Sequence, residues 1–259
     1  MSLLDLQPAT MAFLFAATFF AGFIDAVAGG GGLINIPALF AAFPQTLPAY
    51  LLGTNKIASV SGTSAAALRY MRRGRVEWNA ALPAAGAALV CSFAGAWAVA
   101  RVPGDHLRRA LPFALLALAI YTFAKKELGT LHAPSYRGGQ ERLLALAGGG
   151  AIGFYDGFFG PGTGSFLVFM FVRLFGYDFL GASAVAKIVN VACNLAALGY
   201  FIPAGYVWWE VGLAMALFNI AGSQVGSHLA IARGAAFVRR LFLAVLGALI
   251  VKTFYDGFF

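Results

Sequence analysis

Long apolar runs alternate with short polar breaks along the whole chain. The earlier apolar segments cover about residues 9–28, 33–43, 51–71, 79–100 and 107–124, and the later ones about residues 141–158, 164–176, 182–203, 208–231 and 238–255. A run of about 20 apolar residues is long enough for one helix to cross a bilayer. The alternation typical of a membrane barrel is absent. The pattern predicts an all-α integral membrane protein.

Two of these segments, 33–43 and 164–176, are shorter than the others. A helix of that length reaches only about 16–20 Å, less than the thickness of a bilayer core. We therefore expect each to be a half-helix or a re-entrant piece. The first apolar run is long enough to be a permanent span rather than a cleaved signal.

The chain also contains an internal repeat, because residues 22–123 align without a gap with residues 153–254. The alignment pairs Asp25 with Asp156 and Lys56 with Lys187. It predicts an N-terminal repeat over 1–125, a cytoplasmic linker over 126–140 and a C-terminal repeat over 141–259. Two similar halves that exchange conformations are one way to achieve alternating access in a transporter.

Composition narrows the class further. Hydrophobic residues make up 61% of the chain and charged residues 11%, with a net charge of +8. The basic residues cluster in short loops, which is typical of membrane orientation and not of nucleic-acid binding. Cys91 and Cys193 lie in apolar runs without neighbouring metal ligands, so we expect neither a metal nor a cofactor.

The distribution of Lys and Arg favours an inverted arrangement of the two halves. If each half crosses the membrane an odd number of times, twelve basic residues share one face and four the other, whereas an even number gives nine and seven. The positive-inside rule favours the stronger bias, with both termini outside. The smaller set is Arg101, Arg108, Arg109 and Lys252. The repeated pair Arg108 and Arg109 argues against this orientation.

Polar residues inside apolar segments are costly and are therefore candidates for a site. Asp25 and Asp156 each lie four residues before a glycine-rich break. The short segments that follow would point helix N-termini, with free N–H groups and partial positive charge, at the protein centre. The predicted anion-binding residues here are Gly30, Gly31, Gly32, Gly162, Thr163, Gly164 and Ser165. A second interpretation is that the glycines only permit tight packing or a turn.

Lys56 and Lys187 begin the third segment of each half. Polar residues follow them at helical spacing and form one polar stripe per half. The stripes contain Ser59, Thr63, Asn190 and Asn194, and Asn55 precedes Lys56. We predict that the lysines, Asn55, Asn190 and Asn194 bind an anion. The alternative is that the lysines reach the membrane surface. The two aspartates are either counter-ions or proton-coupling groups.

The run from Gly22 to Gly32 with Asp25, followed by Pro37 and Leu52-Gly53-Thr54-Asn55-Lys56, resembles the sulfite exporter TauE/SafE family. Gly160-Pro161-Gly162-Thr163-Gly164 and Lys187-Ile188-Val189-Asn190 look like the second repeat of that family. The resemblance implies a multi-pass carrier of the bacterial inner membrane. It would export small sulfur-containing anions such as sulfite, sulfonates, sulfoacetate or thiosulfate.

The sequence thus favours a secondary transporter of small anions, coupled to protons and working by alternating access. An anion channel lined by the same donors is the alternative. A membrane enzyme ranks lower, because no nucleophile with an adjacent base, metal cluster or cofactor motif lies on the polar stripes. The expected partners are a small anion and the lipid bilayer, and the oligomeric state is left open.

Overall fold

The computed structural model describes residues 3, 6–73, 75–104, 106–110, 113 and 132–233. Within these residues the regular structure is helical, and no residue is in a strand. The helices are α1 (Pro8–Ala28), α2 (Gly32–Ala42), α3 (Pro48–Arg73), α4 (Trp78–Val99), α6 (Gly139–Phe158), α7 (Thr163–Arg173), α8 (Phe179–Phe201) and α9 (Trp209–Arg233).

These helices confirm the all-α prediction and eight of the ten expected segments. By length and composition, α1, α4 and α8 are able to cross a membrane, whereas α2 and α7 are short apolar helices, as expected for half-helices. The fifth segment of the first half lies mostly outside the described residues, although 106–110 are helical. The expected segment 238–255 lies entirely outside them.

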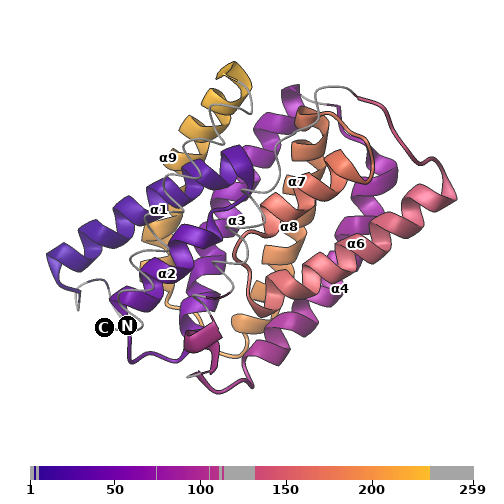
Figure 1. Cartoon of the computed structure of the whole chain (residues 1–259). Helices are drawn as coiled ribbons and strands as arrows, with labels where there is room; N and C mark the ends of the chain where they lie inside the picture. The colour runs from indigo at the N-terminus through magenta and orange to yellow at the C-terminus, as the bar shows by residue number, and fades with distance from the viewer. Residues whose placement is uncertain are drawn as a thin grey trace.

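The helices of the two halves interlock. Helices α3 and α8 contact each other in the centre, with α1, α2 and α9 on one side and α4 and α6 on the other (Figure 1). The first helix of each half packs against the fourth helix of the other half: α1 on α9, and α6 on α4. The third helices do the same, α3 on α9 and α8 on α4.

Equivalent side chains make equivalent bonds across this interface. Ser92 of α4 donates to the Cys193 carbonyl at 2.8 Å, and its repeat partner Ser223 of α9 donates to the Gly62 carbonyl at 2.6 Å. Cys193 and Gly62 are also repeat partners. The repeat seen in the sequence is therefore present in the packing of the described helices.

The central helices α3 and α8 run in opposite directions. The backbone N–H of Trp208, after the end of α8, donates to Thr54 Oγ1 near the start of α3 at 3.0 Å. At the other end, a Cβ on Gly181 near the start of α8 would lie 3.2 Å from the carbonyl oxygen of Arg75, just after α3. The third helices of the two halves are therefore antiparallel in the centre of the structure.

Arg108 contacts the chain just after the C-terminal end of α2. Its guanidinium donates to the carbonyls of Phe43 at 3.3 Å and Thr46 at 2.6 Å, immediately beyond the C-terminus of α2. A cation at that end is favourable, because the last carbonyls of a helix carry partial negative charge. This contact gives Arg108 a local role beside the C-terminal end of a half-helix.

Candidate functional site

Each half contains a break after its first helix. Helix α1 ends at Gly29, which has φ of 80° and donates its N–H to the Asp25 carbonyl at 2.8 Å. After α6, Gly160 and Gly162 have φ of 91° and 78°. Glycine adopts this left-handed region without the clash that a Cβ would cause. The glycine runs therefore turn the chain from each long helix into a half-helix.

The two breaks lie directly against each other. The Ser165 N–H donates to the Gly29 carbonyl at 2.9 Å, and Ser165 Oγ donates to the Ala28 carbonyl at 2.7 Å. A Cβ on Gly164 would lie 2.5 Å from Gly29 Cα. The breaks thus form one junction between the halves, and Ser165 uses both of its donors to hold it together.

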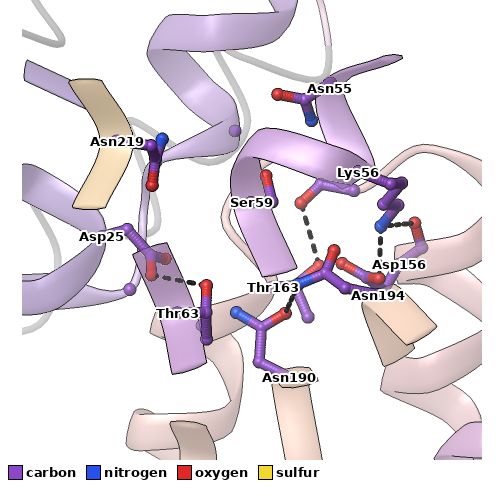
Figure 2. A pocket seen from close by; sticks show the side chains of 15 residues that line it. Asp25, Asn55, Lys56, Ser59, Thr63, Asp156, Thr163, Asn190, Asn194 and Asn219 are labelled. Carbon is purple, nitrogen blue, oxygen red and sulfur yellow. Dashed lines mark hydrogen bonds and ion pairs between the residues drawn. The ribbon is translucent and has the colours of Figure 1, made fainter. Parts of the chain in front are cut away.

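The lysines and aspartates are paired across the halves. Lys56 Nζ on α3 donates to Asp156 on α6, at 2.5 Å to Oδ2 and 3.0 Å to the carbonyl oxygen (Figure 2). Lys187 Nζ on α8 donates to Asp25 on α1, to the carbonyl oxygen and to Oδ2, the latter at 2.9 Å. All four residues are buried. Each lysine thus pairs with the aspartate of the opposite repeat and not with that of its own, and we call these the exchanged pairs.

Within the described residues, each lysine ammonium has one N–H donor that makes no hydrogen bond. An ammonium carries three N–H donors, and in the described part of the chain each lysine uses two of them on its aspartate. The two aspartates differ in their other contacts. Asp25 Oδ2 also accepts from Thr63 Oγ1 at 3.0 Å, whereas Asn194, the repeat partner of Thr63, donates to Asn190 at 3.3 Å (Figure 2).

Replacing Thr63 by valine tests how Asp25 is stabilised. Valine has a similar shape but no O–H donor, so Asp25 would keep Lys187 but lose a hydrogen bond to a buried charge. We expect the free energy of unfolding to fall by about 1.5–3 kcal/mol. Thermal unfolding in detergent measures this. Thr63→Ser, which keeps the donor, is the control, and equal stability of both variants would contradict the assigned role.

A cavity of about 20 Å³ lies at this junction. That volume holds about one water molecule. Polar side chains and the glycine breaks form most of its wall. The lining residues are Asp25, Gly29, Gly31, Gly32, Asn55, Lys56, Ser59, Thr63, Asp156, Gly160, Thr163, Gly164, Asn190, Asn194 and Asn219.

Most of the residues predicted for an anion site meet at this cavity. The wall contains Gly31, Gly32, Asn55, Lys56, Thr163, Gly164, Asn190 and Asn194, together with Asp25 and Asp156. Four predicted residues are not in the wall: Gly30, Gly162, Ser165 and Lys187. Lys187 lies behind Asp25 as its ion-pair partner.

Asn219 of α9 is not among the residues predicted for the site, yet it lies in the wall of the cavity. It donates to the Thr18 carbonyl at 3.4 Å, and a Cβ on Gly62 of α3 would clash with its side chain. Its repeat partner is Ala88, so no repeated polar pair drew attention to it. Ser59 and Thr63, in contrast, were visible as members of the polar stripe.

Both half-helices start at the cavity. Gly31 and Gly32 open α2, Thr163 and Gly164 open α7, and all four residues line the wall. The first turn of a helix carries a partial positive charge. The N–H groups of Leu33, Ile34, Thr163 and Ser165 already donate to backbone carbonyls, so the partial charge of the two helix ends is the main attraction for an anion. The arrangement offers an anion two helix N-termini and a lysine. Across the described residues, no group of three His, Cys, Asp or Glu side chains has the arrangement of a metal site.

Comparison with known proteins gives the family. The family model for the sulfite exporter TauE/SafE matches residues 14–253. The chain belongs to the TauE/SafE family. This confirms the resemblance found in the glycine-rich motifs, and it makes the protein a multi-pass membrane transporter of the TauE/SafE type.

Similar TauE/SafE-type proteins occur in several bacteria. The chain is 44% identical to the probable membrane transporter protein ORF9 of a Sinorhizobium species, covering 97% of this chain and 95% of that one. It is 36% identical to YfcA of Escherichia coli K12, covering 99% and 94%, and 34% identical to a probable membrane transporter of Haemophilus influenzae, covering 98% of each. No solved structure matches the chain.

Proposed function

We propose that the protein is a proton-coupled secondary transporter that exports small anions across the bacterial inner membrane by alternating access. Sulfur-containing anions such as sulfite, sulfonates, sulfoacetate and thiosulfate are the proposed substrates, in line with the family name. The observation that carries the proposal is the junction of two helix N-termini and two exchanged lysine–aspartate pairs around one cavity.

The exchanged pairs support proton coupling. In this structure each ammonium is neutralised by the aspartate of the opposite half. An arriving anion competes with that carboxylate for the lysine, and proton uptake by Asp25 or Asp156 would release the ammonium to the anion. The aspartates then act as counter-ions in one step and as coupling groups in another.

The size of the cavity supports a carrier rather than an open channel. A cavity with room for about one water is smaller than an oxyanion of four heavy atoms, so the residues around it must move apart to admit one. The proposed repeats, 1–125 and 141–259 with a linker at 126–140, are interlocked, so the two similar bodies for that movement each contain helices of both repeats: α1 packs with α9 in one, and α6 packs with α4 in the other.

We also propose the inverted topology. The C-terminal end of α3, with Arg72 and Arg73, lies near the start of α8, whereas Arg101 and Arg108 follow α4 at the opposite end. This grouping of the described basic residues agrees with the orientation that the positive-inside rule favours, with the richer face in the cytoplasm.

Transport by purified protein in liposomes tests the proposal. A proton that moves together with the anion drives the carrier inward from an acidic side, so with an acidic exterior and alkaline interior we expect accumulation of labelled sulfite, thiosulfate or sulfoacetate, abolished by a protonophore and stimulated by the same anion on the opposite side. Export in the cell is the reverse direction of the same cycle, driven by a higher anion concentration inside. Liposomes containing Lys56→Met/Asp156→Asn are the matched control. Failure to move any of the three anions, or single-channel currents far above carrier rates, would contradict a proton-coupled carrier.

A further inference from the structure

The charge around the cavity sets which anions it fits, if the proposed function holds. Among the described residues, the ionised side chains in the wall are Lys56, Asp25 and Asp156; Lys56 pairs with Asp156, and Lys187, outside the wall, pairs with Asp25. The net charge of the two pairs is zero. What remains is the partial charge of the two helix N-termini, about +0.5 each. Their sum of about one unit balances a single negative charge and leaves a dianion uncompensated. Of the proposed substrates, hydrogen sulfite fits this balance, whereas the dianions thiosulfate and sulfoacetate fit only if Asp25 or Asp156 takes up a proton.

One residue of the wall, Asn55, carries a buried acceptor without a donor. Asn55 is only 3% exposed, lines the cavity and precedes Lys56 on α3. Its side-chain oxygen Oδ1 is buried and has no hydrogen-bond partner. An unpaired buried acceptor is costly, and an anion that offers only lone pairs does not relieve that cost. A ligand that brings an O–H or N–H group does.

One small ligand can meet both requirements, a single negative charge and a hydrogen-bond donor. The anionic end fits the third N–H of Lys56 and the first turns of α2 and α7, which share the same wall. The donor end fits Asn55 Oδ1. We propose that the cavity selects small monoanions that carry a hydrogen-bond donor beside the anionic group, such as protonated oxyanions, hydroxysulfonates or hydroxycarboxylates.

Matched ligand pairs test this selectivity. The anions 2-hydroxyethanesulfonate and 1-propanesulfonate have the same charge and length but differ by a hydroxyl and a methyl group, as do glycolate and propionate. Calorimetric binding to the purified full chain in detergent at fixed pH gives the ratio of dissociation constants within each pair. We expect the hydroxyl member to bind at least about tenfold more tightly.

Variants at position 55 assign the selectivity to the oxygen. Asn55→Ala removes Oδ1 and is expected to bring the ratio near one, whereas Asn55→Asp keeps an acceptor and is expected to retain the preference at lower overall affinity. Asn190→Ala, on the same wall, is expected to weaken both members equally and leave the ratio unchanged.

Two results would overturn the inference. Equal affinity for both members of each pair in the wild type contradicts the donor requirement while leaving anion binding intact. An unchanged preference in Asn55→Ala places the selectivity elsewhere. If no member of either pair binds at all, the anion site itself is contradicted and the proposed function fails with it.

Discussion

Lys56→Met is expected to abolish anion transport and to lower the free energy of unfolding by about 3–5 kcal/mol. Methionine has a similar volume but no charge, so the Asp156 carboxylate, buried and 2.5 Å from Nζ in the wild type, would lose its partner. An uncompensated buried carboxylate is far more costly than a neutral group. Thermal unfolding in detergent and uptake in liposomes measure the two effects.

The double variant Lys56→Met/Asp156→Asn separates stability from transport. With both charges removed no ion is left uncompensated, and replacement of a whole buried pair is often neutral for stability. We expect the double variant to unfold close to the wild-type temperature while transporting nothing. Wild-type stability and uptake in the single variant Lys56→Met would show that the Lys56–Asp156 pair is needed for neither.

Gly164→Ala is expected to disrupt the junction between the halves. The added Cβ would lie 2.5 Å from Gly29 Cα and 2.5 Å from Gly29 O, which are backbone atoms that no side-chain rotation moves aside. Overpacking of this kind costs about 1–3 kcal/mol. The shift would also move the helix N-termini at the cavity, so we expect uptake to fall at least about tenfold.

Gly86→Ala is the matched control for this change. Gly86 is exposed on α4, and a Cβ there meets nothing within 4 Å. Because alanine is the better helix former, we expect a gain of up to about 1 kcal/mol and unchanged uptake. Wild-type uptake and stability in Gly164→Ala would show that close contact of the two breaks is not required.

Local signals were enough to predict the described helices and most of the residues that line the cavity. The glycine runs beside Asp25 and Asp156 predicted helix breaks, and the spacing of Lys56, Ser59 and Thr63 predicted one polar helix face. These features depend on neighbouring residues and on helix periodicity. The structure bears out both the breaks and the shared face.

The partners across the halves were not predictable in the same way. Each lysine had two equivalent aspartates available, and the exchanged pairing depends on how α1 packs on α9 and α6 on α4. The hydrogen bonds of Ser165 were not predictable for the same reason, because both of its acceptors lie in the other half. Such contacts depend on how helices of the two halves pack together, and the spacing of residues along one helix does not predict that packing.

The central claim is that the cavity at the junction of the two halves binds the transported anion. An experimental structure with selenite, whose selenium gives an anomalous signal, tests it most directly. We expect one peak inside the cavity, with its oxygens about 2.7–3.2 Å from Lys56 Nζ and from the first N–H groups of α2 or α7. Peaks confined to surface arginines, with none at the junction, would contradict the claim.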